Sequence, residues 1–269
     1  MTRVFLHAGF HKTGTKSVQH FLRSNRPLLR DRAVLVLPAR IRGLTRLGFW
    51  YQDLPEPDML DRMRDAYADF FRSLKRLPGR DLVISAENML GRMPDGRSDC
   101  PYPVAGALLP AIIAALKSLP PPVEIVVYLS MRTQPGWVRS LYAHFAAKPE
   151  QPRLTEDFGR FAARFTHLSL DWEADRIVNA LPDCPVSAQN IETLSNARFG
   201  IAQPFVDFLD LPEGRLAQFS PVEHRHRSAD PALVSELVAL NRSDLDAEAL
   251  AQAKRDLIRA NADDKGEPQ

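Results

Sequence analysis

Short, almost wholly apolar runs alternate along the chain with longer stretches in which apolar residues recur every three or four positions. The short runs are typical of β-strands buried on both faces, and the longer stretches are typical of amphipathic helices. The candidate strands are residues 3–7, 33–37, 81–85, 124–130 and 185–188. Because helical segments separate these runs, the pattern predicts parallel strands joined by crossover helices.

The clearest helical pattern lies at residues 58–77, where apolar side chains form one stripe that we expect to pack on the core. Further helices are predicted at 14–25, 136–147, 156–165, 171–180, 204–209, 232–240 and 247–260. The predicted fold class is α/β, a three-layer P-loop-like sandwich with a central, mostly parallel sheet of about five strands flanked by helices. We expect a single domain over residues 1–260, with helical insertions at about 40–80 and 143–180 and a flexible tail at 261–269.

Composition changes this picture little. Of the 269 residues, 45% are hydrophobic and 25% are charged, as in ordinary globular proteins. The formal net charge of +2 gives no reason to expect a nucleic-acid partner. The apolar run at 104–116 contains Pro110 and is shorter than the ~18 residues that a membrane span needs. Because the start of the chain has no signal-peptide pattern, we expect a cytoplasmic protein, and the oligomeric state stays open.

The first candidate site is the stretch HAGFHKTGTKS at residues 7–17, directly after the first predicted strand. A strand, a glycine-containing turn and a helix start together aim backbone N–H groups and the positive helix end at one point. Gly14 allows a ligand to approach the backbone closely. Charge can come from Lys12 or Lys16, and hydroxyl donors are available on Thr13, Thr15 and Ser17. This combination predicts a phosphate-binding turn.

The same stretch nearly matches the nucleotide-binding P-loop, GxxxxGK followed by Ser or Thr. Counted from Gly9, it has one residue too many before Lys16. The lysine best placed to curl over a phosphate is therefore Lys12, which precedes Gly14 rather than following it.

A second candidate element is EIVVYLSMRTQPGWVRSLY at residues 124–142. It consists of a buried strand that ends at Arg132, followed by a predicted helix that carries Ser140 and Tyr142. An arginine at the strand end and a serine eight residues later can converge on one phosphate.

The first element, an apolar strand followed by HKTGTKS, resembles the 5′-phosphosulfate-binding loop of sulfotransferases, which use 3′-phosphoadenosine 5′-phosphosulfate (PAPS) as donor. Lys12, Thr13, Gly14 and Thr15 match the loop of that family. Lys16 stands where the family has a threonine or serine, so Ser17, the next residue, corresponds only loosely.

The second element resembles the 3′-phosphate-binding element of the same family, with Arg132, Ser140 and Tyr142 at the family's spacing and Pro135 one place late. The two elements lie about 120 residues apart and in the family's order. The resemblance, closest to bacterial carbohydrate-type sulfotransferases, implies a parallel-sheet nucleotide fold. It also implies PAPS as donor substrate, its bisphosphate (PAP) as product, and a carbohydrate-like acceptor.

The implied reaction moves a sulfuryl group in line from the donor phosphate to a hydroxyl or amine. By analogy with phosphoryl transfer, cations stabilise the charge that develops on the leaving oxygen. We expect Lys12 to supply that charge, assisted by loop amides and by His11, with no metal ion. The expected general base is Glu87, which follows the strand in DLVISAEN at the edge where parallel-sheet sites open. A carboxylate that caps a helix or orients the acceptor is the alternative role for Glu87.

In relatives a late basic loop closes over the 3′-phosphate, and the resemblance gives this role to Arg225, Arg227 and Ser228. A solvated loop that caps the next helix explains these residues equally well. Two other functions stay open. In a P-loop kinase or NTPase, Lys16 and Ser17 would contact phosphate and magnesium, and Glu87 would replace the usual strand-end aspartate. A nucleotide-binding protein without catalysis is the third possibility.

Overall fold

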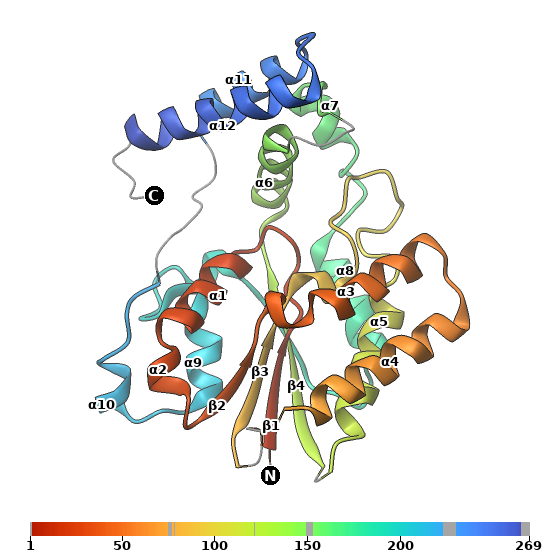
Figure 1. The fold of residues 1–269 in the computed structure, drawn as a ribbon, viewed down its shortest axis with the longest axis vertical. Coiled ribbons are helices and arrows are strands. Elements are labelled where there is room, and N and C mark those ends of the chain that lie inside the picture. Colours follow the sequence, from red (N-terminus) through yellow and green to blue (C-terminus); the bar gives the residue numbers. More distant parts are fainter. Residues whose placement is uncertain are drawn as a thin grey trace. The chain divides into compact units, whose positions relative to one another are not determined.

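The structure is a computed structural model that describes residues 2–74, 77, 79–120, 122–148, 153–222 and 230–264. The chain folds into two compact units (Figure 1). Unit 1 consists of the described residues of Met1–Thr133 and Leu168–Arg225. Unit 2 consists of the described residues of Gln134–His167 and His226–Gln269.

Unit 1 is built on a five-stranded sheet in which every strand pairing is parallel, with the order β2-β3-β1-β4-β5. This arrangement confirms the predicted α/β fold. The strands are β1 (Thr2–His7), β2 (Ala33–Val36), β3 (Asp81–Ser85), β4 (Val123–Met131) and β5 (Val186–Asn190). Every predicted strand is present, with ends that differ by at most two residues.

The strand order creates a switch point between β1 and β4. These strands are neighbours, and His7 lies opposite Tyr128 in their register. The connection after β1 leads to β2 on one side of the sheet, whereas the connection after β4 leads to β5 on the other side. In open parallel sheets, ligands bind in the crevice that such diverging connections leave at the carboxyl ends of the strands. The turn that contains Lys12 and the residue Arg132 both start from this point.

One face of the sheet is covered by α1 (Thr15–Ser24) and α9 (Gln203–Leu209), with α2 (Arg26–Leu29) and α10 (Glu213–Leu216) beside them (Figure 1). Alternate strand residues such as Phe5 and Tyr128 point to this face and pack on the helices. The Phe5 ring lies 4.9 Å from that of Phe205 and 5.5 Å from that of Tyr128. Phe21 and Leu22 of α1 belong to the same buried cluster, which holds α1, and therefore the turn before it, on the sheet.

The helices α3 (Pro38–Asp53), α4 (Pro57–Arg72), α5 (Ala105–Lys117) and α8 (Leu170–Ala180) complete the layers of unit 1. α5 contacts β4, α4 and α8, and α3 contacts α4. α3 lies in the helical insertion expected at about 40–80, although its bounds were not predicted. The sequence pattern did not predict α5 as a helix. α5 is the apolar run that contains Pro110, and its side chains are buried between the sheet and α4. Within the described part of the chain, no helix is long and apolar enough to cross a membrane.

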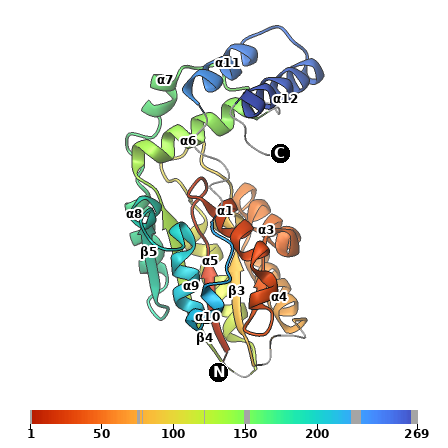
Figure 2. The same ribbon diagram turned by 90° about the vertical axis from the view of Figure 1, so that its left-hand side faces the viewer.

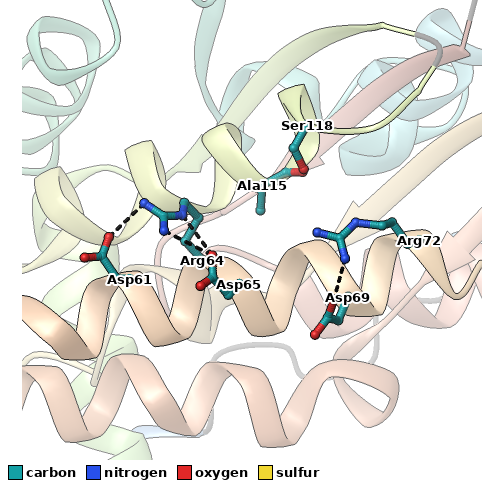
Figure 3. A network of polar contacts seen from close by, with 7 residues as sticks. All are labelled: Asp61, Arg64, Asp65, Asp69, Arg72, Ala115 and Ser118. Carbon is teal, nitrogen blue, oxygen red and sulfur yellow. Dashed lines mark hydrogen bonds and ion pairs between the residues drawn. The ribbon is translucent and has the colours of Figure 1, made fainter.

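The predicted stripe on α4 is confirmed, with Met63, Tyr67 and Phe71 buried. The opposite side of α4 carries ion pairs within the helix, drawn in Figure 3. Arg64 contacts Asp61 and Asp65, and Arg72 contacts Asp69 at 2.5 Å. Such exposed pairs contribute ~0–1 kcal/mol each, so the buried stripe holds α4 in place.

Unit 2 consists of α6 (Gln134–Ala147), α7 (Phe158–Ala163), α11 (Pro231–Asn241) and α12 (Ala247–Asp264). α11 packs against both α6 and α12 (Figure 2). The buried Asn241 amide donates to the Ala146 carbonyl, and Lys254 Nζ donates to the carbonyl of Lys148 at 2.7 Å. The stretch predicted as an insertion, 143–180, contributes α7 to unit 2 and α8 to unit 1. The division into one domain and a tail stays a prediction.

Candidate nucleotide-binding site

The turn between β1 and α1 is held by β4 for three residues beyond the strand. The N–H of Ala8 donates to the Tyr128 carbonyl, and the N–H of Phe10 donates to the Ser130 carbonyl, both at 3.2 Å. The backbone then turns through two left-handed residues, Lys12 with φ 69° and Gly14 with φ 82°. For a lysine this conformation costs about 1–2 kcal/mol. Strain of this kind is typically kept where a loop must present its groups in a fixed arrangement.

Gly9 allows the turn to approach β4 closely. A Cβ at this position would lie 2.2 Å from Ser130 Oγ and 2.3 Å from His7 Nε2. We expect Gly9→Ala to lower the free energy of unfolding by about 1–3 kcal/mol, because both neighbours are buried and cannot move aside. In thermal denaturation this is a fall in Tm of several degrees.

Gly43→Ala is the matched control for this prediction. Gly43 lies in α3, and a Cβ there meets nothing within 4 Å. Its replacement should raise stability by about 0.5–1 kcal/mol, the ordinary gain of alanine over glycine in a helix. A Gly9→Ala protein that melts at or above the wild-type temperature would contradict the close approach.

The start of α1 offers donors for an anion. The first N–H groups of a helix have no partner within the helix, and they carry its positive end. Gly14 precedes the helix and provides no side-chain cap. The Thr15 hydroxyl is buried and finds no hydrogen-bond partner among the described residues. An unsatisfied buried hydroxyl at a helix N-terminus fits a bound phosphate, so the residues present are compatible with the predicted ligand.

Thr13 has a different position from Thr15. Its hydroxyl donates to the Phe10 carbonyl at 2.6 Å and lies 2.8 Å from Ser130 Oγ. Because its proton is directed at Phe10, the Thr13 side chain holds the turn together. A contribution of Thr13 to an anion would come from its main-chain N–H. Ser17 is also buried, and its N–H donates to the Gly14 carbonyl.

Arg132 lies against the turn, as the sequence predicted. Its Nη1 is 3.4 Å from the carbonyl oxygen of Lys12, which is 120 positions earlier in the chain. On its other side, Arg132 Nε is 3.7 Å from the Glu192 carboxylate. Glu192 also accepts hydrogen bonds from the N–H and the hydroxyl of Thr133. Glu192, which orients Arg132 from the segment after β5, was not predicted as a site residue.

Positive charge is concentrated around the turn. The pKa of Lys12 is lowered by burial and further by the charges of Lys16 and Arg132, while the Glu87 carboxylate raises it. Lys16 is exposed on the first turn of α1. Repulsion among three cations favours the binding of an anion, because the anion compensates charges that now oppose one another.

Glu87 lies beside the turn. It begins the short helix η1 (Glu87–Leu90), and one residue, Ala86, separates it from the end of β3 at Ser85. From α1, the side-chain amide of Gln19 donates to Glu87 Oε2 at 3.1 Å and to the Ser85 carbonyl at 3.3 Å. The Glu87 charge raises the pKa of both Lys12 and His11, so the carboxylate is close to both.

His11 is held on both sides of its ring. Its main-chain N–H donates to the Tyr102 hydroxyl at 2.8 Å, and that hydroxyl lies 3.2 Å from Nδ1. The Tyr102 proton is then directed at Nδ1, so Nε2 carries the ring proton and donates to Asn88 Oδ1 at 3.0 Å. Burial lowers the pKa of His11 and favours this neutral form. His11 therefore fixes the turn to η1, and its predicted assistance to Lys12 stays a prediction.

Other predicted site residues belong to unit 2 or lie outside the described residues. Ser140 and Tyr142 are on α6 in unit 2, where the Tyr142 hydroxyl donates to the Glu156 carbonyl at 3.1 Å. Arg225, Arg227 and Ser228 lie outside the described residues. Among the residues that are described, no three His, Cys, Asp or Glu side chains gather as a set of metal ligands.

Three residues of the site were missed although the sequence carries a signal for them. His7, Ser85 and Ser130 are each a polar residue at the carboxyl end of an apolar strand. All three are buried at 3% exposure or less. A polar side chain inserted at that end of a buried strand needs a partner, and neighbouring strands bring such residues together.

Comparison of the chain with protein-family models, with curated proteins and with solved structures found no match. What the protein does must therefore be inferred from the chemistry of the site. The groups gathered at the switch point are a strained lysine turn, a helix start, an arginine and a carboxylate.

Proposed function

We propose that the protein is a PAPS-dependent sulfotransferase that acts on a hydroxyl or amine of a carbohydrate-like acceptor. The observation that carries the proposal is the meeting of Arg132 with the Lys12 turn, at 3.4 Å between Nη1 and the Lys12 carbonyl. A turn and a helix start can bind one phosphate in any nucleotide. A second cation beside them suits a nucleotide with a second phosphate, which PAPS has at its 3′ position.

In this proposal the turn and the helix start hold the 5′ end of the donor. Thr15 and the loop N–H groups donate to phosphate oxygens, and Lys12 neutralises the charge that accumulates on the leaving oxygen. Arg132 binds the 3′-phosphate. Glu87 takes the proton of the acceptor as the new bond to sulfur forms and the bond between sulfur and the donor phosphate oxygen breaks. The products are the sulfated acceptor and PAP.

The position of Glu87 supports catalysis rather than binding alone. A protein that only bound the nucleotide would have no need of a carboxylate beside its phosphate turn, where the charge opposes anion binding. Glu87 is held there by Gln19, and its charge raises the pKa of Lys12. A base in this position can accept a proton from a hydroxyl placed over the turn.

The discriminating experiment compares ligands by thermal shift. PAP should raise the Tm of the protein more than ATP with magnesium does, because binding to the folded state stabilises it. Transfer of labelled sulfate from PAPS to a panel of carbohydrates then tests catalysis. A preference for ATP with magnesium would indicate the kinase or NTPase, and binding of PAP without any transfer would indicate a binding protein.

The role of Arg132 is tested by a comparison of two nucleotides. Arg132→Ala should weaken PAP binding about 10- to 100-fold, since hydrogen bonds to charged groups contribute ~1.5–3 kcal/mol. Binding of AMP, which lacks the 3′-phosphate, should change little. Arg92→Ala is the control, because Arg92 makes an exposed ion pair with Asp53. Equal losses for PAP and AMP, measured by calorimetry, would show that Arg132 does not contact the 3′-phosphate.

A further inference from the structure

Four buried side-chain groups form a continuous chain from β3 to the phosphate turn. Ser85 Oγ lies 2.8 Å from His7 Nδ1, and His7 Nε2 lies 2.9 Å from Ser130 Oγ. Ser130 Oγ lies 2.8 Å from the Thr13 hydroxyl, which in turn lies 2.6 Å from the Phe10 carbonyl. The chain thus crosses three strands, β3, β1 and β4, and ends inside the turn.

The direction of every hydrogen bond in this series follows from its last acceptor, the Phe10 carbonyl. A carbonyl oxygen only accepts, so Thr13 donates to Phe10. The single Thr13 proton is then used, so Thr13 accepts from Ser130. Ser130 has used its own proton and must accept from His7 Nε2–H. A neutral imidazole with its proton on Nε2 has an acceptor at Nδ1, and Ser85 donates to it.

The surroundings of His7 keep its ring neutral. The side chain is fully buried and contacts the rings of Tyr128 and Phe205, with centroids 5.3 and 5.0 Å away. Among the residues that the structure describes, the hydrogen-bond partners of its two ring nitrogens are serine hydroxyls. Burial lowers the pKa of His7 to about 3. The direction of the chain therefore persists at every pH at which the protein would work.

We propose that His7 is a positioning residue for the phosphate turn, which it holds in the anion-binding conformation through Ser130 and Thr13. This inference rests on the proposed function only in that the turn binds a nucleotide phosphate. Ser130 holds the turn twice, by its main-chain carbonyl at Phe10 and by its hydroxyl at Thr13. Lys12 follows between these two anchored residues, in the left-handed conformation that its own side chain disfavours. The series of hydrogen bonds thereby fixes the direction in which Lys12 and the first N–H groups of α1 face the ligand.

A core residue without this role would affect stability alone. Loss of these hydrogen bonds should instead reduce the affinity of the folded protein for the anion, because the ligand would then have to order the turn. Hydrogen bonds in one network are also coupled, so removal of two links should cost little more than removal of one.

The test measures PAP binding to the full-length protein by calorimetry. Ser130→Ala and Thr13→Val should each weaken binding about 10-fold, the equivalent of one lost hydrogen bond. Thr13→Ser, which keeps the hydroxyl, should restore most of the loss seen in Thr13→Val. The double variant Ser130→Ala/Thr13→Val should bind nearly as well as either single variant. Ser187→Ala is the control, since Ser187 is an exposed serine on β5.

Nuclear magnetic resonance of the ring nitrogens tests the chain without any ligand. His7 should carry its proton on Nε2, with no change between pH 5 and pH 8. A proton on Nδ1, or titration of the ring in this range, would overturn the proposal. So would PAP affinities of Ser130→Ala and Thr13→Val within twofold of wild type. If the wild type binds no PAP, the proposed function fails. The nitrogen signals of His7 still decide whether the series of hydrogen bonds is formed.

Discussion

Replacement of Lys12 by alanine is expected to lower kcat for sulfuryl transfer about 100- to 1,000-fold, the usual cost of one lost donor to developing charge. The affinity for PAP should fall much less, because Thr15, Arg132 and the helix start still contact the nucleotide. Lys12 is the half-buried cation of the turn, and its neighbours lower its pKa. In the proposed reaction this charge would stabilise the leaving oxygen of the donor. Steady-state and single-turnover kinetics with PAPS measure the loss.

Two variants separate the charge of Lys12 from its backbone conformation. Lys12→Gly removes the charge and also relieves the left-handed strain at φ 69°. If charge is decisive, it should lose as much turnover as Lys12→Ala does. Lys16 lies four residues further along and is exposed on α1. Lys16→Ala should therefore lower kcat less than Lys12→Ala does. A kinase that uses the lysine after Gly14 would give the reverse order, and near-wild-type kinetics in Lys12→Ala would reject the assignment altogether.

Glu87→Gln is expected to lower kcat about 100- to 10,000-fold, the range that general bases contribute. The amide has nearly the shape of the carboxylate and can still accept the hydrogen bond from Gln19, so the fold should be kept. It cannot take a proton from the acceptor. Donor affinity should stay within a few-fold of wild type or rise slightly, because a negative charge beside the phosphate turn has been removed.

The control for this prediction is Glu213→Gln. Glu213 is an exposed carboxylate that pairs with Arg198. Glu213→Gln should leave kcat and the affinity for PAP unchanged. Full activity in Glu87→Gln would remove Glu87 as the base and assign it to orientation of the acceptor. Loss of PAP binding together with turnover would instead indicate a structural role for Glu87 in the turn.

The secondary structure was readable from the sequence wherever neighbours along the chain carry the signal. Four of the strands, β1 to β4, are largely apolar runs, and α4 has a regular stripe. β5 at the sheet edge is mostly polar and exposed. The helical insertion expected at about 40–80 contains α3, but the bounds of this helix were not predicted. Its apolar positions form no continuous stripe and two glycines interrupt it, although Pro38 marks its start. α5 was missed because it is apolar on nearly all sides and contains Pro110, so it lacks the contrast between faces that marks a surface helix.

The candidate site was predicted in part. Lys12, Thr15 and Arg132 come together as expected, since each follows a strand whose carboxyl end lies at one edge of the sheet. The motif offered the Thr13 hydroxyl as a phosphate donor, whereas in the structure this hydroxyl donates to the Phe10 carbonyl. Nothing in the motif distinguishes the two threonines. Only their positions relative to β4 do.

The sequence alone specified a parallel α/β sheet and a phosphate-binding turn after its first strand. Both depend on signals within a few residues, namely the spacing of apolar side chains and the conformational freedom of glycine. The partners of His7, in contrast, are Ser85 and Ser130, 78 and 123 residues away. Their hydrogen bonds exist because the strand order places β3 and β4 on either side of β1, and a buried polar group takes whichever partner the packed sheet brings to it.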